Sequence, residues 1–453
     1  MSATPLCDAL RSFAAQHPLR MHMPGHKGRA LPLTEASSLS PLDVTELPPT
    51  GDLFAGGGAI GEAEALWADT FQMACCLFLT GGSTQGMLAA LTLSCSPGSR
   101  ILLDRSCHRS VYNALALLDL KPVYLNRPWL LEEGLFGPAA PAEVDRLLSL
   151  FPDIKTICIT SPTYYGLLSD IPALSAVAHR HSATLIVDGA HGAHLPFLDD
   201  FTFSAADILV VSAHKTLPAL GQGALLLAGP QYSHRELRRA ASIYGSSSPS
   251  YPIMASLDAA RAFLKGEGGQ RYQKTAAAVS ALRGRFPTLK ESCAPLDPCR
   301  LVVHTADGLA LQTALEQRGI YPEMADKGHV VFICTCADTD ADFTRLAEIL
   351  TELMSTDPQP AACVLSPPQP QAVLTPREAL FAPREYLPLR ECAGRISAQQ
   401  IAPYPPGIPV VAPGELVEKK TVAYFEGIGY NMLEDIEVVR AGACVLPGTA
   451  PPR

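Results

Sequence analysis

Short, almost unbroken apolar runs alternate with helix-like segments through the middle of this chain. The apolar runs that we predict to be strands are 100–104, 122–125, 154–159, 184–188 and 208–212. Intervening segments, such as 144–150 and 172–180, carry apolar residues at helical spacing. Strands that are apolar on both sides need helices on both faces of their sheet. This alternation therefore predicts an α/β fold built on a mostly parallel sheet.

Length and composition exclude several classes of protein. The 453 residues are 47% hydrophobic and 17% charged, which suits a large core shared by two or three domains. A net charge of -9 without a basic cluster argues against a nucleic-acid partner. No apolar run reaches the roughly 18 residues of a membrane span. The N-terminus does not resemble a signal peptide, so we expect a cytoplasmic protein with no membrane partner.

The thirteen cysteines are scattered along the chain. Without an export signal, free thiols are the default expectation. The pairs Cys75-Cys76 and Cys334-Thr335-Cys336 do not have the spacing of zinc ligands. We therefore expect no metal site.

A lysine follows the last predicted strand, within Ser212-Ala213-His214-Lys215. The carboxyl ends of parallel strands are the usual place for catalysis in open α/β sheets. An amine there suits a Schiff base with a carbonyl, and pyridoxal phosphate is the usual carbonyl. Taken alone, the motif is explained better by a lysine that faces water.

Three other element boundaries carry residues that would complete a pyridoxal phosphate site. Gly81–Gly86 opens a helix, and its free N–H groups with Ser83 and Thr84 would cradle a phosphate, although an ordinary N-cap explains them too. His108 begins another helix, where its ring would stack on a flat cofactor or simply face solvent. Asp188 ends a strand, where it would keep the pyridine nitrogen protonated or only cap the next helix.

Each of these residues has an ordinary explanation, but their joint placement at successive element boundaries does not. Together with Lys215, they predict an enzyme that uses pyridoxal 5'-phosphate. The segment Gly56–Gly61 also matches the G-x-G-x-x-G pattern of dinucleotide-binding proteins. No strand precedes it, so we interpret it as a flexible glycine loop.

The pattern along the chain predicts two α/β units, a linker rich in proline, glutamine and alanine, and a C-terminal part. We place an N-terminal segment at 1–60, a large cofactor-binding domain at 61–284, a small α/β domain at 285–356, the linker at 357–376 and a C-terminal domain at 377–453.

Motifs at both ends of the chain are more specific than the lysine. They are His-Met-Pro-Gly-His-Lys-Gly at 22–28, Tyr-Pro-Pro-Gly-Ile-Pro at 404–409 and Pro-Gly-Glu at 413–415. With them, nearly the whole chain resembles the Orn/Lys/Arg decarboxylase family, in the short form that lacks an N-terminal wing domain. The resemblance implies an aspartate-aminotransferase-like large domain (pyridoxal phosphate fold type I), a small α/β domain and a C-terminal α+β domain.

The resemblance also implies roles for individual residues. Lys215 would carry the cofactor, with Asp188, His108 and His214 as its catalytic neighbours. Glu415 would meet the distal cationic group of the substrate, although a solvated turn glutamate is an equally good explanation. The residues that we expect around the cofactor are Ser83, Thr84, Gln85, His108, Asp188, Ala190, Ser212, His214 and Lys215.

The activity implied is the α-decarboxylation of a basic amino acid by a homodimer or larger homo-oligomer. Arginine, which would give agmatine, is favoured over lysine and ornithine. An aminotransferase or a carbon–carbon or carbon–sulfur lyase would use the same fold, because a fold does not fix the reaction. A non-catalytic relative that binds the cofactor is a further alternative.

Overall fold

The structure is a computed structural model of the chain. It describes residues 2–21, 23–24, 26–29, 34–198, 201–292, 294–354, 366–403 and 409–442. Parts of the N-terminal and C-terminal motifs, including His22, Gly25 and residues 404–408, lie outside these ranges, as does the first part of the predicted linker, 357–365.

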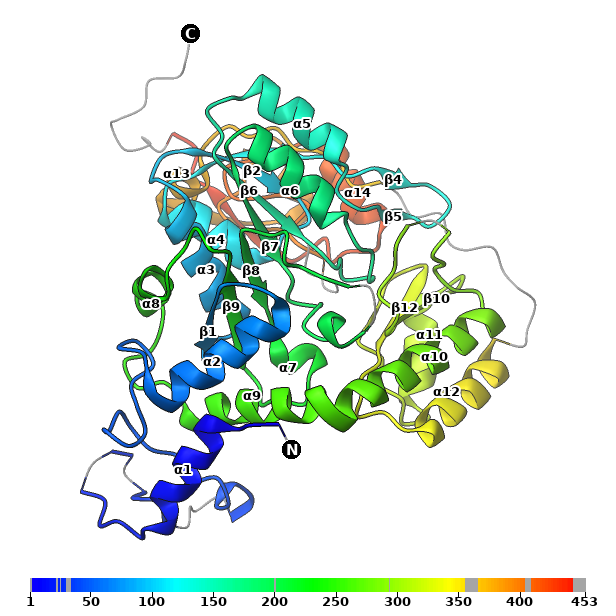
Figure 1. The fold of residues 1–453 in the computed structure, drawn as a ribbon. Helices are drawn as coiled ribbons and strands as arrows, with labels where there is room; N and C mark the ends of the chain where they lie inside the picture. The colour runs from blue at the N-terminus through cyan, green and yellow to red at the C-terminus, as the bar shows by residue number, and fades with distance from the viewer. Residues whose placement is uncertain are drawn as a thin grey trace.

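A seven-stranded sheet forms the centre of the described structure (Figure 1). Its strands, in spatial order, are β1 (Cys75–Leu79), β9 (Ala224–Ala228), β8 (Ile208–Val211), β7 (Thr184–Asp188), β6 (Thr156–Thr160), β2 (Arg100–Asp104) and β3 (Lys121–Leu125). All neighbours from β8 to β3 are parallel, and β9 alone runs in the opposite direction. The predicted α/β class with a mostly parallel sheet is confirmed. The strand β1 was not predicted.

Helices cover both faces of this sheet, as its strands require because their side chains are buried on both sides. The helices of this large unit are α1 (Pro5–Ala15), α2 (Gly58–Phe71), α3 (Gly82–Ser94), α4 (Arg109–Leu117), α5 (Pro141–Leu150), α6 (Ile171–Arg180), α7 (Ala213–Thr216), α8 (His234–Ser242), α9 (Tyr251–Phe263) and α10 (Gly269–Arg285). The short hairpin β4 (Trp129–Leu130) and β5 (Leu135–Phe136) follows β3.

The helix α3 packs closely on the sheet because Gly86 has no side chain. A Cβ atom at this position would lie 2.6 Å from Cγ1 of Val210 on β8 and 2.7 Å from Cδ1 of Leu79 on β1. The first turn of α3 therefore lies beside the ends of these strands. Gly82 begins the helix with a φ of +72°, a left-handed conformation that favours glycine.

A smaller α/β unit lies to one side of the sheet and is reached through α9 and α10 (Figure 1). Its antiparallel sheet has the order β10 (Arg300–His304), β12 (His329–Ile333) and β11 (Met324–Ala325). The helices α11 (Gly308–Glu316) and α12 (Asp340–Leu353) complete a separate apolar core with α10.

The C-terminal part has its own small core of residues between Leu389 and Val438. Its elements are α13 (Pro376–Phe381), β13 (Arg384–Pro388), β14 (Arg395–Ile396), β15 (Leu416–Val417), α14 (Lys419–Gly427) and β16 (Asp435–Val439). The Arg377 guanidinium donates to the carbonyl groups of Ala116 and Leu117 at the end of α4, both at 3.2 Å. The C-terminal part therefore packs against the large unit. None of the helices described in the structure is long and apolar enough to cross a membrane.

Candidate active site

A cavity of about 810 Å³ opens where several parallel strands of the central sheet end. Its wall contains residues that directly follow β1, β2, β6, β7 and β8, because these strands all point the same way. The small unit and the C-terminal part close other sides of it, through residues such as Asp326 and Tyr424. The cavity is therefore shared by all three parts of the chain.

Lys215 lies on the single-turn helix α7, directly after β8, and reaches the cavity wall. Burial lowers the pKa of its amine, and the nearby charge of Arg300 acts in the same direction, whereas Asp188 opposes them. The Nζ atom lies 3.0 Å from Nε2 of His191. An amine with a lowered pKa is more often neutral, and a neutral amine is the form that attacks a carbonyl.

Asp188 ends β7 and is almost completely buried. One carboxylate oxygen accepts a hydrogen bond from the backbone N–H of Ala190 at 3.2 Å. Burial raises the pKa of this carboxyl group, although the charge of Lys215 partly counteracts the effect. The carboxylate therefore lacks a full counter-charge, and a protonated ring nitrogen would supply one.

The start of α3 provides a site for an anion on the same wall. Ser83 and Thr84 lie in the first turn of this 13-residue helix, where backbone N–H groups have no partner within the helix. The hydroxyl of Ser212, at the end of β8, donates to the Ser83 hydroxyl at 3.2 Å. His214 also lines the cavity, and its Nδ1 is 3.1 Å from the carbonyl oxygen of Gly223.

His108 caps α4 and lies on the cavity wall. Its Nδ1 atom is 2.9 Å from the Ser110 hydroxyl and accepts from the Ser110 N–H at 3.2 Å. The side chain faces the open cavity. Loss of hydration beside the surrounding protein, followed by the charge of Lys215, nevertheless lowers the pKa of the ring to about 4. The ring is therefore uncharged near neutral pH and suits contact with a flat aromatic group.

These residues fit pyridoxal phosphate. The wall offers an amine, a buried carboxylate that lacks a counter-charge, a helix start for a phosphate and an uncharged ring, each on a different element. Eight of the ten residues predicted for the site lie on this one cavity: Ser83, Thr84, His108, Asp188, Ala190, Ser212, His214 and Lys215.

Two predicted site residues point elsewhere. The Gln85 side chain is buried, accepts from the Gly81 N–H at 3.0 Å and donates to the Ala241 carbonyl at 3.1 Å, so it braces the loop instead of lining the cavity. Both carboxylate oxygens of Glu415 accept from the Arg105 guanidinium at 2.7 Å. The substrate-binding role of Glu415 stays a prediction, and within one chain this pairing leaves neither oxygen free of Arg105.

Three parts of the cavity wall were not predicted. His191 contacts Lys215, and Arg127 forms a buried ion pair with Asp104. Asp326, from the small unit, accepts from the Tyr165 hydroxyl at 2.6 Å and from the His329 N–H at 2.8 Å. Burial raises the pKa of Asp326, but its bonds to His329 and Tyr165 outweigh burial and lower it, so the group is ionised. Arg127 follows the end of β3, so its place after a strand could have predicted it as a site residue. Nothing in the sequence around Asp326 indicates that it reaches the cavity.

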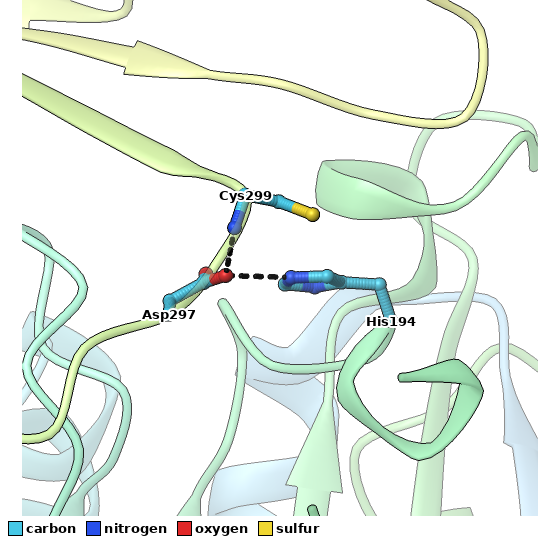
Figure 2. Close-up of side chains that lie close together, drawn as sticks. All are labelled: His194, Asp297 and Cys299. Atoms are coloured by element: carbon cyan, nitrogen blue, oxygen red, sulfur yellow. Dashed lines mark hydrogen bonds and ion pairs between the residues drawn. The ribbon is translucent and has the colours of Figure 1, made fainter. Parts of the chain in front are cut away.

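A second polar group lies where the large and small units meet. Figure 2 shows His194, Asp297 and Cys299, and Oδ1 of Asp297 lies 2.9 Å from both Nε2 of His194 and the Cys299 nitrogen. Their ligand-type atoms lie within 4.8 Å of one another. Burial holds the pKa of the Cys299 thiol well above its usual range, and the Arg300 guanidinium lies 3.8 Å from Oδ2 of Asp297. An added cation would face this guanidinium, so we assign the group a role in joining the two units.

Comparison with known proteins agrees with this geometry. The model of the Orn/Lys/Arg decarboxylase major domain matches residues 4–300, and that of the Orn/Lys/Arg decarboxylase C-terminal domain matches residues 360–431. The uncharacterized protein YaaO of Bacillus subtilis is 34% identical over 92% of this chain and 93% of its own length. An arginine decarboxylase of the same organism is 30% identical over 93% of this chain and 92% of its own length.

Among solved structures, the lysine decarboxylase LdcF of Francisella novicida has the same fold. The TM-score is 0.81 at 20% sequence identity, and the match covers 96% of this chain and 81% of the other.

Proposed function

The chain belongs to the Orn/Lys/Arg decarboxylase family and is a pyridoxal-phosphate-dependent decarboxylase, and we propose that its substrate is arginine. The observation that carries this proposal is that ionised Asp326 lines the same cavity as Lys215. A carboxylate on the wall favours a substrate with a cationic side chain, and a guanidinium suits it through paired N–H donors. The arginine decarboxylase relative, at 30% identity over most of both chains, favours arginine over lysine.

The residues of the wall divide the work. Pyridoxal phosphate, when bound, withdraws electrons from the α-carbon of an amino acid that is joined to it. Lys215 would supply the amine that holds the cofactor, and Asp188 would keep a proton at its ring nitrogen. Ser83, Thr84 and the start of α3 would hold its phosphate, and His108 would contact its ring. These roles rest on the fit of the wall to the group.

Asp326 lines the cavity, and Glu323 lies near it, beside the lining residue Tyr164. The Tyr164 hydroxyl donates to Glu323, and Glu323 is close enough to raise the pKa of Lys215 in part. We expect the guanidinium of arginine to lie on the side of Asp326, with its α-amino group toward Lys215. The α-carboxylate is bonded to the same carbon as the α-amino group, so it would also lie at the Lys215 end of the cavity.

A substrate panel tests the proposal. The holoenzyme is given arginine, lysine, ornithine and leucine, and released carbon dioxide is measured. We expect the highest kcat/KM with arginine and no release with leucine. No release from any basic amino acid would overturn the proposed reaction, and a preference for lysine or ornithine would overturn the proposed substrate.

The variant Asp326→Asn tests the acidic wall. Loss of a charge-assisted hydrogen bond should lower kcat/KM for arginine by about 10- to 100-fold. The matched control is Asp153→Asn, because Asp153 is an exposed aspartate that pairs with Arg100. Because Asp326 also holds His329, unfolding is measured in parallel. An unchanged kcat/KM in a folded Asp326→Asn enzyme would remove Asp326 from the substrate site.

Two broader expectations also stay proposals. We propose a homodimer or larger homo-oligomer, which rests on the resemblance to the family, and sedimentation of the purified holoenzyme tests it. We also propose a cytoplasmic location, which the many buried free thiols support because thiols persist in reducing compartments. Fractionation of cells that express the chain tests this location.

A further inference from the structure

We propose that His191 is a catalytic residue that shares a proton with Lys215 and donates it to the α-carbon of the substrate after carbon dioxide has left. The proposal rests on the proposed decarboxylase function and assigns the group that protonates the α-carbon. The reaction needs such a group, because the carbon loses a carboxylate and gains a hydrogen.

The contact between His191 and Lys215 is the first observation. The Nε2 atom of His191 lies 3.0 Å from Nζ of Lys215, which is hydrogen-bond distance. His191 is only 6% exposed and lines the cavity. It lies three residues beyond Asp188, and its ring is held 4.7 Å from the ring of Tyr164. A buried ring in this position touches the reacting amine without blocking the cavity.

The other two histidines of the cavity are engaged elsewhere. His108 uses Nδ1 for the Ser110 hydroxyl and N–H, and His214 uses Nδ1 toward the Gly223 carbonyl. Within the described ranges, neither forms a hydrogen bond with Lys215. His191 is therefore the histidine that is placed to exchange a proton with this amine.

The surrounding charges decide how the shared proton behaves. Burial, followed by the charges of Lys215 and Arg300, holds the pKa of His191 well below its usual range. Burial and Arg300 also lower the pKa of Lys215, against the opposing charges of Asp188 and Glu323. A pair with two lowered pKa values gives up its proton readily, as a general acid must.

Arg300 is a positioning residue in this arrangement. Its side chain is 1% exposed, and none of its three guanidinium nitrogens has a hydrogen-bond partner in the described part of the chain. Its nearest carboxylate, Asp297, is already bonded to His194 through Oδ1. Arginine keeps its charge at all working pH values. The Asp297 carboxylate, 3.8 Å away, makes no hydrogen bond to Arg300, and the charge of this buried guanidinium lowers the pKa of both His191 and Lys215.

The proposed step balances. The bond between the α-carbon and the carboxylate breaks, and its electron pair stays with the α-carbon while carbon dioxide leaves. A new carbon–hydrogen bond forms with the proton shared by His191 and Lys215. The pair then regains one proton from solvent, so each turnover consumes one proton and releases one carbon dioxide. No oxidant or reductant takes part.

The variants His191→Phe and His191→Gln test the step. We expect kcat for arginine to fall about 100-fold with little change in KM, because general acid catalysis contributes about this much. In a single turnover, carbon dioxide should appear at close to the wild-type rate, while the amine product lags behind it. His179→Gln, on an exposed histidine of α6, is the control. Equal slowing of both products, or an unchanged kcat, would overturn the proposal.

Arg300 gives a second test that does not need turnover. The visible absorbance of the resting holoenzyme is titrated with pH in Arg300→Met and Arg300→Lys. Because Arg300 lowers the pKa of Lys215 and of His191, its removal should move the titration to higher pH, and Arg300→Lys should restore it. If Arg300 acts through the pair, His191→Phe should reduce this shift. An Arg300→Met titration that matches the wild type would overturn this part of the proposal.

These tests separate two failures. If the wild-type holoenzyme releases no carbon dioxide from a basic amino acid, the proposed function fails, while the absorbance titration still reports on His191, Lys215 and Arg300. If carbon dioxide is released normally but amine release keeps pace in His191→Phe, only the role of His191 fails.

Discussion

The chain contains two contrasting sets of buried charges. Arg105 and Glu415 form a complete pair, with two contacts of 2.7 Å that join the large unit to the C-terminal part. In the cavity, Lys215 and Asp188 influence each other's pKa, but no hydrogen bond joins them. In the first set each charge has a hydrogen-bonded counter-charge within the protein. In the second set the two opposite charges are not hydrogen-bonded to each other. Buried charges that the protein leaves incomplete therefore mark the place where a ligand completes them.

Of the changes in the incomplete set, Lys215→Ala should cause the largest loss of activity. We expect decarboxylation to fall by about 10⁴-fold or more, because the variant lacks the amine that would hold the cofactor. The yellow absorbance of the holoenzyme should disappear in the same variant. Lys121→Ala, on the exposed start of β3, should keep both. An enzyme that keeps colour and turnover without Lys215 would contradict the assignment of this lysine.

Asp188→Asn should have the next largest effect. The amide cannot hold a proton at the ring nitrogen, so kcat should fall by about 10²- to 10³-fold. The buried site should tolerate the uncharged side chain, because burial already raises the pKa of Asp188. Rates and thermal unfolding are measured together, with Asp145→Asn on the surface as control. A large loss of stability with normal turnover would place Asp188 in the first set instead.

The variant Glu415→Gln tests the ion pair between Glu415 and Arg105. Because the change leaves the buried guanidinium of Arg105 without its counter-charge, the free energy of unfolding should fall by about 3 kcal/mol. Denaturant unfolding measures this loss, and kcat/KM for arginine is measured on the folded variant; an unchanged value would limit Glu415 to the ion pair with Arg105. The opposite pattern, normal stability with a low kcat/KM, would show that Glu415 meets the substrate.

The smallest effect concerns pH. His108 has a pKa of about 4 in the fold, below its ordinary value, so the unfolded chain binds this proton first as the pH falls. The stability of the apoenzyme should therefore decline as the pH falls from the ordinary histidine range toward 4. In His108→Gln, part of this decline should be absent. An identical pH dependence in both proteins would show that His108 is not held in its uncharged form by the fold.

Much of the sheet and cavity followed from local sequence patterns. The bounds of β2 and β7 match the predicted strands, because unbroken apolar runs with polar ends are a strong local signal. Lys215, Asp188 and His108 lie at the ends of such strands, so their meeting followed from the parallel order.

The contributions that need long-range contacts were not predictable in this way. The reversed direction of β9 depends on its partners, and Asp326 reaches the cavity only because the small unit packs there. His191 follows Asp188 by three residues, but its contact with Lys215 depends on the distant segment that carries α7, so the local sequence does not reveal it. The pairing of Glu415 with Arg105 joins two distant segments of the chain, so the local motif does not reveal it.

The close packing at Gly86 fixes how near the first turns of α3 lie to strands β8 and β1. A methyl group at this position would lie 2.6 Å from a side-chain carbon of Val210 and 2.7 Å from one of Leu79, so these side chains or the helix α3 would have to move. Affinity for a phosphate group would then change without alteration of any residue that touches it. The position of the phosphate-binding turn therefore depends on Gly86, which faces the sheet and does not line the cavity.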